Sequence, residues 1–245
     1  MNVLEVQGLT KRYPAFTLNG VSFDVPQGAV MGFIGRNGAG KSTTLKSILG
    51  MVHPDAGAAR VFGMDYAENE RVIRRELGVV LGGIDFYPKK KIKTITDVTR
   101  RFYNNWDEEK YRHYLELFHI DESKRVDQLS SGMKVKYMIA LALSHNARLL
   151  ILDEPTSGLD PVSRDELTEL LRRVVADGTR SVLFSTHITS DLEKCASHIA
   201  FIKDGELQYT GSLEDFRGHY RDVGATLEDI IVHVERRPLD EDAII

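Results

Sequence analysis

The feature that most constrains this chain is an octapeptide, Gly35-Arg-Asn-Gly-Ala-Gly-Lys-Ser42, which matches the pattern G-x-x-x-x-G-K-[ST]. In this pattern successive backbone N–H groups surround a phosphate, and the helix that follows adds the positive end of its dipole. A compact apolar run, Val30–Ile34, precedes the octapeptide, and Lys41–Leu49 is predicted to be a helix. This context favours a phosphate-binding loop over the alternative, a plain glycine-rich turn.

The loop predicts a site for a nucleoside triphosphate and its metal ion. Lys41 is expected to reach the β- and γ-phosphates, and the Ser42 hydroxyl is expected to bind Mg²⁺. The nucleotide-binding residues predicted in this loop are Gly35, Arg36, Asn37, Gly38, Ala39, Gly40, Lys41, Ser42 and Thr43.

Composition narrows the class of protein further. The chain has 245 residues and a formal net charge of −4, which argues weakly against a dedicated nucleic-acid binder. Cys195 is the only cysteine, so an internal disulfide and a cysteine-built metal cluster are excluded. No apolar run is long enough to span a bilayer, and the N-terminus lacks the features of a signal peptide. We therefore expect a cytoplasmic protein that reaches a membrane only through a partner.

Short apolar runs alternate with helix-like stretches along the chain. Such alternation predicts an α/β fold with a mainly parallel core sheet. Two N-terminal segments alternate apolar and polar residues instead, which predicts an added antiparallel β edge. The expected buried strands are Val30–Ile34, Leu77–Leu81, Leu149–Leu152, Ser181–Phe184 and Ile199–Ile202, and the two alternating segments are Val3–Val6 and Val21–Val25.

The domain prediction is one nucleotide-binding unit with a helical insertion and a C-terminal appendage. Residues 1–215 are expected to form the nucleotide-binding domain, and residues of about 85–145 the insertion. Asp107–Phe118 has aromatic and leucine residues at helical spacing, which favours a small core of the insertion over a ligand platform. Residues 216–245 are expected to form a packed helical appendage that ends in a solvated tail.

A second apolar run ends in two carboxylates, Asp153 and Glu154. At the end of a buried strand, Asp153 can face the nucleotide-bound metal ion. Glu154 can then polarise water for in-line attack on the γ-phosphate. The alternative is a strand-end turn with two solvated acids, which becomes the weaker interpretation beside a phosphate loop.

Three further motifs resemble those of the nucleotide-binding subunits of ABC transporters. Leu129-Ser-Ser-Gly-Met133 resembles that family's LSGGQ signature, and Asp153–Asp160 matches its Walker B segment running into the D-loop. Ser185-Thr-His187 matches its switch histidine, and Tyr13 lies where the family has an aromatic residue that stacks on adenine. The resemblance covers residues of about 3–215, with every motif in family order.

The resemblance implies an ATPase subunit with ATP and Mg²⁺ as cofactors. Glu154, His187 and Lys41 are then the expected catalytic residues, and Ser42 and Asp153 the metal ligands. It also implies a head-to-tail dimer, either of two copies or with a paralogue, in which the signature of one subunit faces the γ-phosphate of the other.

The signature residues and His187 can also be interpreted without the resemblance. Ser130, Ser131 and Gly132 begin a predicted helix near Ser131 and so provide a second anion site. Without the resemblance these residues would be an ordinary helix cap, and His187 and Tyr13 structural side chains.

The resemblance further implies separate transmembrane permease subunits, with this chain peripheral at the inner face of the cell membrane. The segment Phe102–Glu109 and an altered glutamine loop resemble a bacterial group linked to export of drugs or antimicrobial peptides. The alternatives are a non-transport ABC ATPase and a regulatory ATP-binding module. The presence of Glu154 and His187 argues against a regulatory module that binds ATP without hydrolysing it. The single cassette without sustained heptads argues against a non-transport ABC ATPase.

The chain departs from the family pattern at the glutamine loop and in the signature. Gly82 occupies the position where the family usually has a glutamine, with Asp85 the nearest polar substitute. In the signature, Ser131 replaces the first glycine and Met133 the glutamine. A lysine-rich segment, Tyr87–Lys93, follows the altered loop. In the family this region meets the membrane subunits; attraction to anionic lipid and a simple solvated lysine run are the other interpretations.

Overall fold

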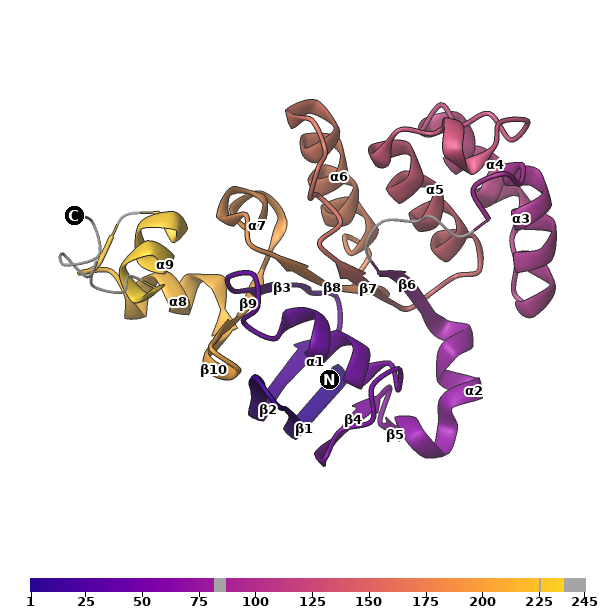
Figure 1. Ribbon diagram of the computed structural model, residues 1–245. Coiled ribbons are helices and arrows are strands. Elements are labelled where there is room, and N and C mark those ends of the chain that lie inside the picture. Colours follow the sequence, from indigo (N-terminus) through magenta and orange to yellow (C-terminus); the bar gives the residue numbers. More distant parts are fainter. Residues whose placement is uncertain (82–86, 225, 236–245) are drawn as a thin grey trace.

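The computed structural model describes residues 1–81, 87–224 and 226–235, which fold into two sheets with helices packed on them (Figure 1). The strands are β1 Asn2–Tyr13, β2 Phe16–Pro26, β3 Val30–Ile34, β4 Ala56–Val61, β5 Met64–Asp65, β6 Leu77–Leu81, β7 Leu149–Asp153, β8 Ser181–Thr186, β9 His198–Lys203 and β10 Glu206–Ser212. The helices are α1 Lys41–Ile48, α2 Tyr66–Glu76, α3 Ile92–Thr99, α4 Glu108–Leu117, α5 Ser131–Ser144, α6 Pro161–Val174, α7 Thr189–Cys195, α8 Leu213–His219 and α9 Leu227–Glu235, with short 3₁₀ turns at Arg100–Phe102 and Val126–Gln128.

The larger sheet is the predicted parallel core. Its strand order is β10-β9-β3-β8-β7-β6; β6, β7, β8, β3 and β9 run parallel, and β10 pairs antiparallel with β9. Every residue of β3, β7 and β8 is buried. Both faces of these strands are covered, which is why they are continuous apolar runs in the sequence. The predicted α/β fold is confirmed.

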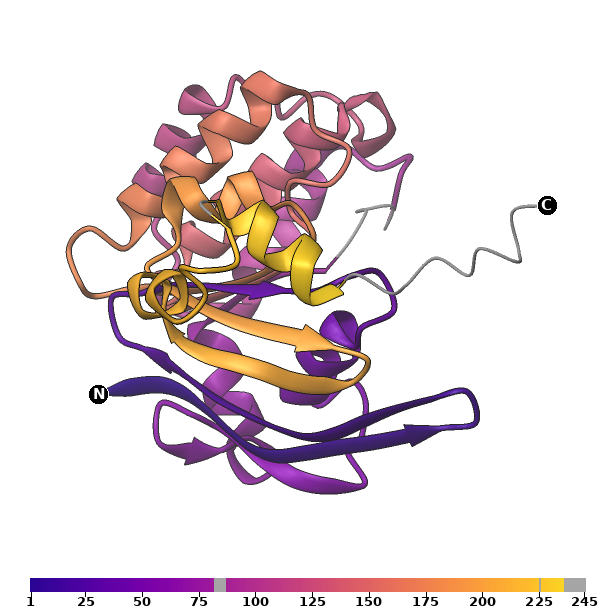
Figure 2. The same ribbon diagram turned by 90° about the vertical axis from the view of Figure 1, so that its left-hand side faces the viewer.

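Alternate side chains of the parallel strands enter different hydrophobic cores. Leu149 and Ile151 of β7 belong to the core shared with α1 and the antiparallel sheet. Leu150 and Leu152 belong to the core shared with α5, α6 and α7 on the opposite face. This division follows from the two-residue period of a strand. The resulting layers are visible in Figure 2, with the antiparallel sheet at the bottom and the helices at the top.

The predicted antiparallel edge is a sheet of its own, in the order β2-β1-β4-β5. Strand β1 pairs antiparallel with both β2 and β4. Val21, Phe23 and Val25 of β2 are buried and alternate with exposed residues, as expected for a sheet with one covered face. Strand β4 was not predicted from the sequence, because it has a buried residue only at Ala59 and Val61.

The described residues between 87 and 146 form helices joined by turns, with an isolated bridge between Lys91 and Arg125. Their aromatic residues form a local core, as predicted, that includes Tyr111, Phe118 and Tyr137. The Thr96 hydroxyl is 2.8 Å from the hydroxyls of both Tyr111 and Tyr137. Burial raises the pKa of both phenols, so they remain neutral hydrogen-bonding groups.

The C-terminal helices α8 and α9 pack on the core of the parallel sheet. Leu213, Phe216, Leu227 and Ile230 belong to the same hydrophobic cluster as α6 and α7. The helical appendage is therefore continuous with the main core, and the boundary at residue 215 stays a prediction. The predicted solvated tail at 236–242 lies outside the described residues, as do Gly82 and Asp85 of the altered glutamine loop.

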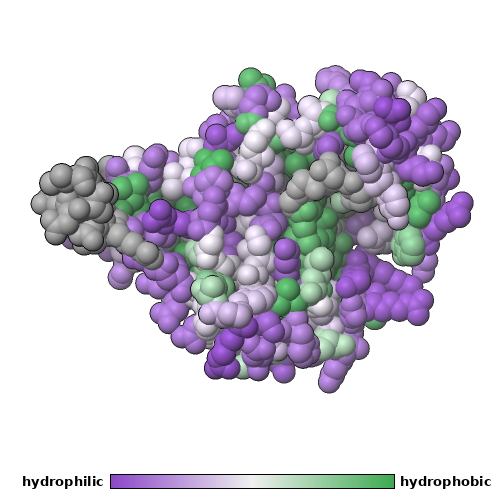
Figure 3. Space-filling model, viewed as in Figure 1, coloured by the Kyte–Doolittle hydropathy of each residue, from purple (hydrophilic) through white to green (hydrophobic). Residues whose placement is uncertain are grey.

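No helix among the described residues is both long and apolar enough to cross a bilayer. On the face seen in Figure 3, hydrophobic atoms gather near the centre, whereas the region of α3 and α4 at the upper right is mostly hydrophilic.

Candidate active site

The phosphate loop connects the end of β3 to the start of α1. A Cβ atom at Gly35 would lie 2.3 Å from the carbonyl oxygen of Ile202, so no side chain fits there. Gly40 has a φ of +111°, which side chains rarely allow, and its Cβ would meet Phe16 at 2.9 Å. Helix α1 begins directly after Gly40 at Lys41. The glycines therefore let the loop fold back tightly over the positive end of the helix.

The Lys41 side chain is buried beneath this loop. Its ammonium donates hydrogen bonds to the carbonyl oxygens of Gly35, at 2.7 Å, and Arg36, at 3.2 Å. It also lies 3.1 Å from Glu154 Oε1, an ion pair in which the lysine side chain is 5% exposed. The cation and the carboxylate predicted from separate motifs therefore meet in one place.

The two acids at the end of β7 have different surroundings. Asp153 is buried, and its Oδ1 accepts a hydrogen bond from the Ser185 hydroxyl at 2.6 Å. The backbone N–H of Glu154 donates to the same hydroxyl oxygen at 2.9 Å, and Glu154 has a φ of +51°. A bulky residue with positive φ is unusual and marks a position held by its surroundings. Ser185, which was singled out only as a neighbour of His187, thus orients both acids.

His187 extends the contact that starts at Lys41. Its Nδ1 lies 2.8 Å from Glu154 Oε2, and its side chain is 41% exposed. One carboxylate therefore bridges a buried ammonium and a half-exposed imidazole. A carboxylate held in this way can accept a proton from water, and the imidazole can hold it in place.

A pocket of about 500 Å³ opens directly at these residues. Its lining contains most of the predicted loop residues together with the proposed base. The lining residues are Ala15, Phe16, Arg36, Asn37, Gly38, Gly40, Lys41, Ser42, Thr43 and Glu154. Backbone amides, a lysine and a helix N-terminus are groups that can bind a polyanion such as a triphosphate, so the chemistry of this lining agrees with the predicted phosphate site.

Tyr13 is not part of that lining, but Phe16 is. Tyr13 is 41% exposed and pairs directly with Phe16 across the hairpin between β1 and β2. Directly opposed residues present their side chains on the same face of a hairpin. Phe16 was not predicted as a site residue, because its position beside the loop depends on the register of this hairpin. The one sequence signal for that register was the dipeptide Tyr13-Pro14.

The signature residues lie outside the pocket. Ser130 caps α5, its hydroxyl accepting a hydrogen bond from the Met133 N–H at 3.2 Å. The Ser131 hydroxyl donates to the carbonyl oxygen of Gly158 at 3.2 Å. Ser130 and Ser131 are exposed, whereas Gly132 is buried against Leu159 and Ser163. The predicted start of the helix near Ser131 is confirmed, and the residues at its N-terminus, Ser130 and Ser131, are exposed. That they form a second anion site stays a prediction.

The described residues contain no group of three His, Cys, Asp or Glu side chains placed to hold a metal ion. The predicted metal ligands are one hydroxyl, Ser42, in the lining of the pocket and one carboxylate, Asp153, at the end of β7. Both provide oxygen atoms, which suit Mg²⁺ when the nucleotide's phosphates and water complete its shell.

A phosphate loop between a parallel strand and a helix, with two acids at the end of another parallel strand of the same sheet, defines a nucleoside triphosphatase of the P-loop class. The ABC transporter family matches residues 18–157 of the chain. The chain belongs to this family. It is an ATP-binding subunit of an ABC transporter, and its activity is ATP hydrolysis coupled to transport.

Individual relatives agree with the family. The chain is 32% identical over 208 residues to the bacitracin transport ATP-binding protein BcrA of Bacillus licheniformis, covering 84% of this chain and 68% of the relative. It is 34% identical over 208 residues to the Nod factor export ATP-binding protein I of Burkholderia thailandensis, covering 82% of this chain and 68% of the relative.

A solved structure of the ATP-binding subunit of an ABC transporter is 30% identical and has a TM-score of 0.85, covering 96% of this chain and 100% of that chain. A dimeric ATP-binding cassette with bound ADP and Pi is 20% identical and has a TM-score of 0.74, covering 86% of this chain and 98% of that chain. This structure shares the fold.

Proposed function

We propose that this chain binds ATP and Mg²⁺ in the pocket at Lys41, hydrolyses ATP in a head-to-tail dimer, and thereby drives export by separate transmembrane permease subunits. The observation that carries the proposal is the Glu154 carboxylate, which contacts both Lys41 and His187. The two contacts join the phosphate-binding cation, the base and the switch histidine into one catalytic unit.

The nucleotide is held by the loop and by the tip of the hairpin. The backbone from Gly35 to Thr43 surrounds the phosphates, and Lys41 neutralises the β- and γ-phosphate charge. Tyr13 and Phe16 share a face of the hairpin, and together they form the surface on which adenine stacks. Ser42 and Asp153 would provide the protein ligands of Mg²⁺, and the bound ion would neutralise charge that develops on the phosphate oxygens.

Glu154 acts as the general base. A water molecule attacks the γ-phosphorus while the bond to the ADP oxygen breaks, and the proton released by the water passes to the Glu154 carboxylate. A phosphate at the loop competes with Glu154 for the Lys41 ammonium, and so directs the carboxylate toward water. His187 holds Glu154 through the contact at Nδ1.

The exposed signature completes the site of a second subunit. Ser130 and Ser131 lie outside the pocket of their own chain, yet they present a hydroxyl and a helix N-terminus to the outside. An anion site in this position fits the γ-phosphate bound by another subunit. The Ser131 hydroxyl also donates a hydrogen bond to the carbonyl oxygen of Gly158, so the signature contacts the segment that follows Glu154 in the same chain.

The partners are a second ATP-binding subunit and separate permease subunits, with no nucleic acid among them, and the chain works at the inner face of the cell membrane. Two relatives carry names that specify bacitracin transport and Nod factor export. These names, together with the resemblance of Phe102–Glu109 to exporters of drugs or antimicrobial peptides, favour export as the direction.

The dependence of hydrolysis on chain concentration tests the shared site. Phosphate release per chain should rise with concentration, because the site is complete only in the dimer. Ser130→Arg should abolish hydrolysis but leave ATP binding to the single subunit within about twofold, since Ser130 lies outside the pocket. Ser123→Arg, an exposed serine outside the signature, is the control. A rate per chain that is independent of concentration and unaffected by Ser130→Arg contradicts the proposal.

A further inference from the structure

A group of cations lies at one edge of the helical region, where two segments of the chain run side by side. The amides of Ile92 and Lys93 donate to the carbonyl oxygens of Lys124 and Glu122, at 2.9 and 3.1 Å. In the other direction, the amide of Val126 donates to the carbonyl oxygen of Lys90 at 3.2 Å. This pairing gathers a set of residues that we call the basic edge: Lys89, Lys90, Lys91, Lys93, Lys124 and Arg125.

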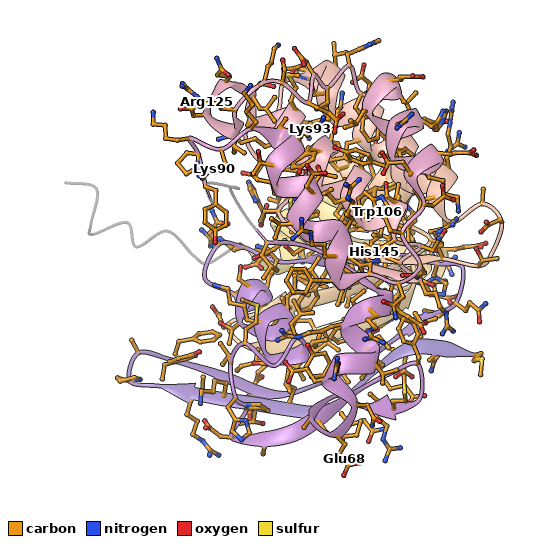
Figure 4. The ribbon with its side chains drawn as sticks, turned by 90° about the vertical axis from the view of Figure 1, so that its right-hand side faces the viewer. Glu68, Lys90, Lys93, Trp106, Arg125 and His145 are labelled. Carbon is orange, nitrogen blue, oxygen red and sulfur yellow. The ribbon has the colours of Figure 1, made fainter. Side chains whose placement is uncertain are left out.

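All six cations of the basic edge are exposed. Lys89 and Arg125 share one carboxylate, that of Asp127, each at 3.0 Å. Within the part of the chain that the structure describes, the other four lysines make no ion pair. Figure 4 shows Lys90, Lys93 and Arg125 gathered at one end of the molecule, with Glu68 at the opposite end.

The carboxylates between these two segments are fewer than the cations of the basic edge. Glu122 accepts a hydrogen bond from the Tyr111 hydroxyl at 2.9 Å, and Asp121 accepts from the Ser123 amide at 2.9 Å. With Asp127, these acids leave the basic edge a local excess of positive charge. The excess is opposite in sign to the net charge of the whole chain, −4. Exposed positive charge of this kind attracts an anionic surface.

An exposed aromatic ring adjoins the lysines. Tyr87 is 67% exposed and begins a turn in which its carbonyl oxygen accepts a hydrogen bond from the Lys90 amide at 2.9 Å. Pro88 occupies the second position of the turn, where its fixed φ favours such a bend. Tyrosine rings gather at the interface between membrane and water, because one end is apolar and the other polar.

We propose that the basic edge binds directly to the anionic headgroups of a phospholipid bilayer. Lysine side chains are flexible point charges, whereas a fixed partner is usually held by the planar fork of arginine. Five of the six cations are lysines, so the edge suits a fluid sheet of phosphate charges better than one rigid protein partner. Tyr87 adds a ring that can enter the headgroup layer.

This inference goes beyond the proposed function, in which the membrane is reached through the permease alone. It rests on that function only for the choice of membrane. None of the residues of the basic edge lines the pocket at Lys41. Lipid binding and nucleotide chemistry can therefore be measured and lost independently.

The test is flotation of the purified chain with vesicles, without nucleotide and without permease. One set of vesicles contains phosphatidylcholine alone, and the other contains about 30% phosphatidylglycerol. The edge variant is Lys90→Gln, Lys91→Gln and Lys93→Gln combined, which removes cations without breaking an ion pair. The control variant is Lys46→Gln, Arg60→Gln and Arg71→Gln combined; these cations are exposed, lie elsewhere, and change the net charge equally.

The chain should bind only the anionic vesicles, and binding should weaken when salt rises from about 50 to about 300 mM. The edge variant should bind about 100-fold more weakly than the wild type, and the control variant about equally to it. Equal binding by the two variants, binding to the neutral vesicles, or binding of the edge to an acidic polypeptide or duplex DNA but not to anionic vesicles overturns the inference. ATP binding should be unchanged in both variants, so a failure here leaves the proposed function intact.

Discussion

Lys41 Nζ lies 3.1 Å from Glu154 Oε1, so the cation predicted to hold phosphate contacts the carboxylate predicted to activate water. A buried ammonium is stable only when opposite charge and hydrogen-bond acceptors surround it. Glu154 provides the charge, and the carbonyl oxygens of Gly35 and Arg36 provide the acceptors. A bound triphosphate supplies stronger negative charge at the same ammonium. In the proposed mechanism, phosphate binding to Lys41 therefore releases the Glu154 carboxylate, and the two events are coupled through one side chain.

Removal of that ammonium should abolish nucleotide binding. In Lys41→Ala the β- and γ-phosphates lose their main cation, and the affinity for ATP should fall by at least about 100-fold. Equilibrium binding of a fluorescent ATP analogue measures the effect. Lys46→Ala, an exposed lysine of the same helix, is the matched control and should bind normally. An affinity of Lys41→Ala close to that of the wild type means that the phosphate loop is wrongly assigned.

The hairpin tip should distinguish ATP from inorganic triphosphate. Loss of a stacked ring costs about 1–3 kcal/mol, so Phe16→Ala and Tyr13→Ala should each weaken ATP binding by about 5-fold to 100-fold. Inorganic triphosphate has no base to stack, and its affinity should not change. Competition of both ligands against the fluorescent analogue gives the comparison, with Phe102→Ala, an exposed ring elsewhere, as the control.

If the affinities for ATP and for triphosphate fall equally, the two rings support the phosphate loop and do not stack on adenine. If Phe16→Ala alone is defective, adenine stacks on Phe16 and the prediction for Tyr13 is wrong.

The buried imidazole of His145 should make stability depend on pH. Burial lowers the pKa of His145 from 6.5 to about 4, and its ring stacks on Tyr103 with centroids 3.8 Å apart. Between these two values the unfolded chain binds a proton that the folded chain does not. The contribution of neutral His145 to the free energy of unfolding is therefore complete above pH 6.5. It is lost as the pH falls toward 4, and the free energy of unfolding falls by about 3 kcal/mol in total.

Urea unfolding at pH 7.5 and pH 5 measures this loss. His145→Phe keeps an aromatic ring against Tyr103 and removes the titrating group, so its stability should fall less between the two pH values than that of the wild type. His113→Phe, at an exposed position, should leave the pH dependence unchanged. An identical fall in the wild type and His145→Phe rules out His145 as the source.

The single thiol should report unfolding. Cys195 is buried, and burial raises its pKa to about 12, which suppresses the reactive thiolate. Alkylation of the native chain should be at least about 100-fold slower than alkylation in denaturant. Timed labelling followed by mass spectrometry gives both rates. Comparable rates would mean that α7 opens readily and that Cys195 does not pack as described.

The sequence predicts the parallel strands well because burial on both faces requires continuous apolar runs. Leu149–Leu152 and Ser181–Phe184 satisfy that requirement and were located directly. Strand β10 was not predicted, because no residue of Glu206–Ser212 is fully buried and the segment has no such run. Phe216 was assigned to an appendage, but it packs edge-on against Phe201 with ring centroids 6.4 Å apart. Sequence spacing does not reveal which core an apolar residue enters.

The loop and the two acids of the site could be predicted because their motifs are local. The contact of Lys41 with Glu154 could not, since it depends on β3 and β7 each pairing with β8. The role of Phe16 depends in the same way on the register of the hairpin. Ser185 holds both acids from a neighbouring strand, a relationship that appears only when the sheet is assembled.

The most direct test of the central claim is the Glu154→Gln variant. An amide cannot accept the proton of the attacking water, so ATP should still bind while hydrolysis falls by at least about 100-fold. Unhydrolysed ATP should then hold two chains together through the signature residues. The measurement is size-exclusion chromatography of Glu154→Gln with Mg²⁺ and ATP, alongside a phosphate-release assay. We predict a dimer that forms only with ATP and releases almost no phosphate. A monomer at every chain concentration, or phosphate release at the wild-type rate, contradicts the account.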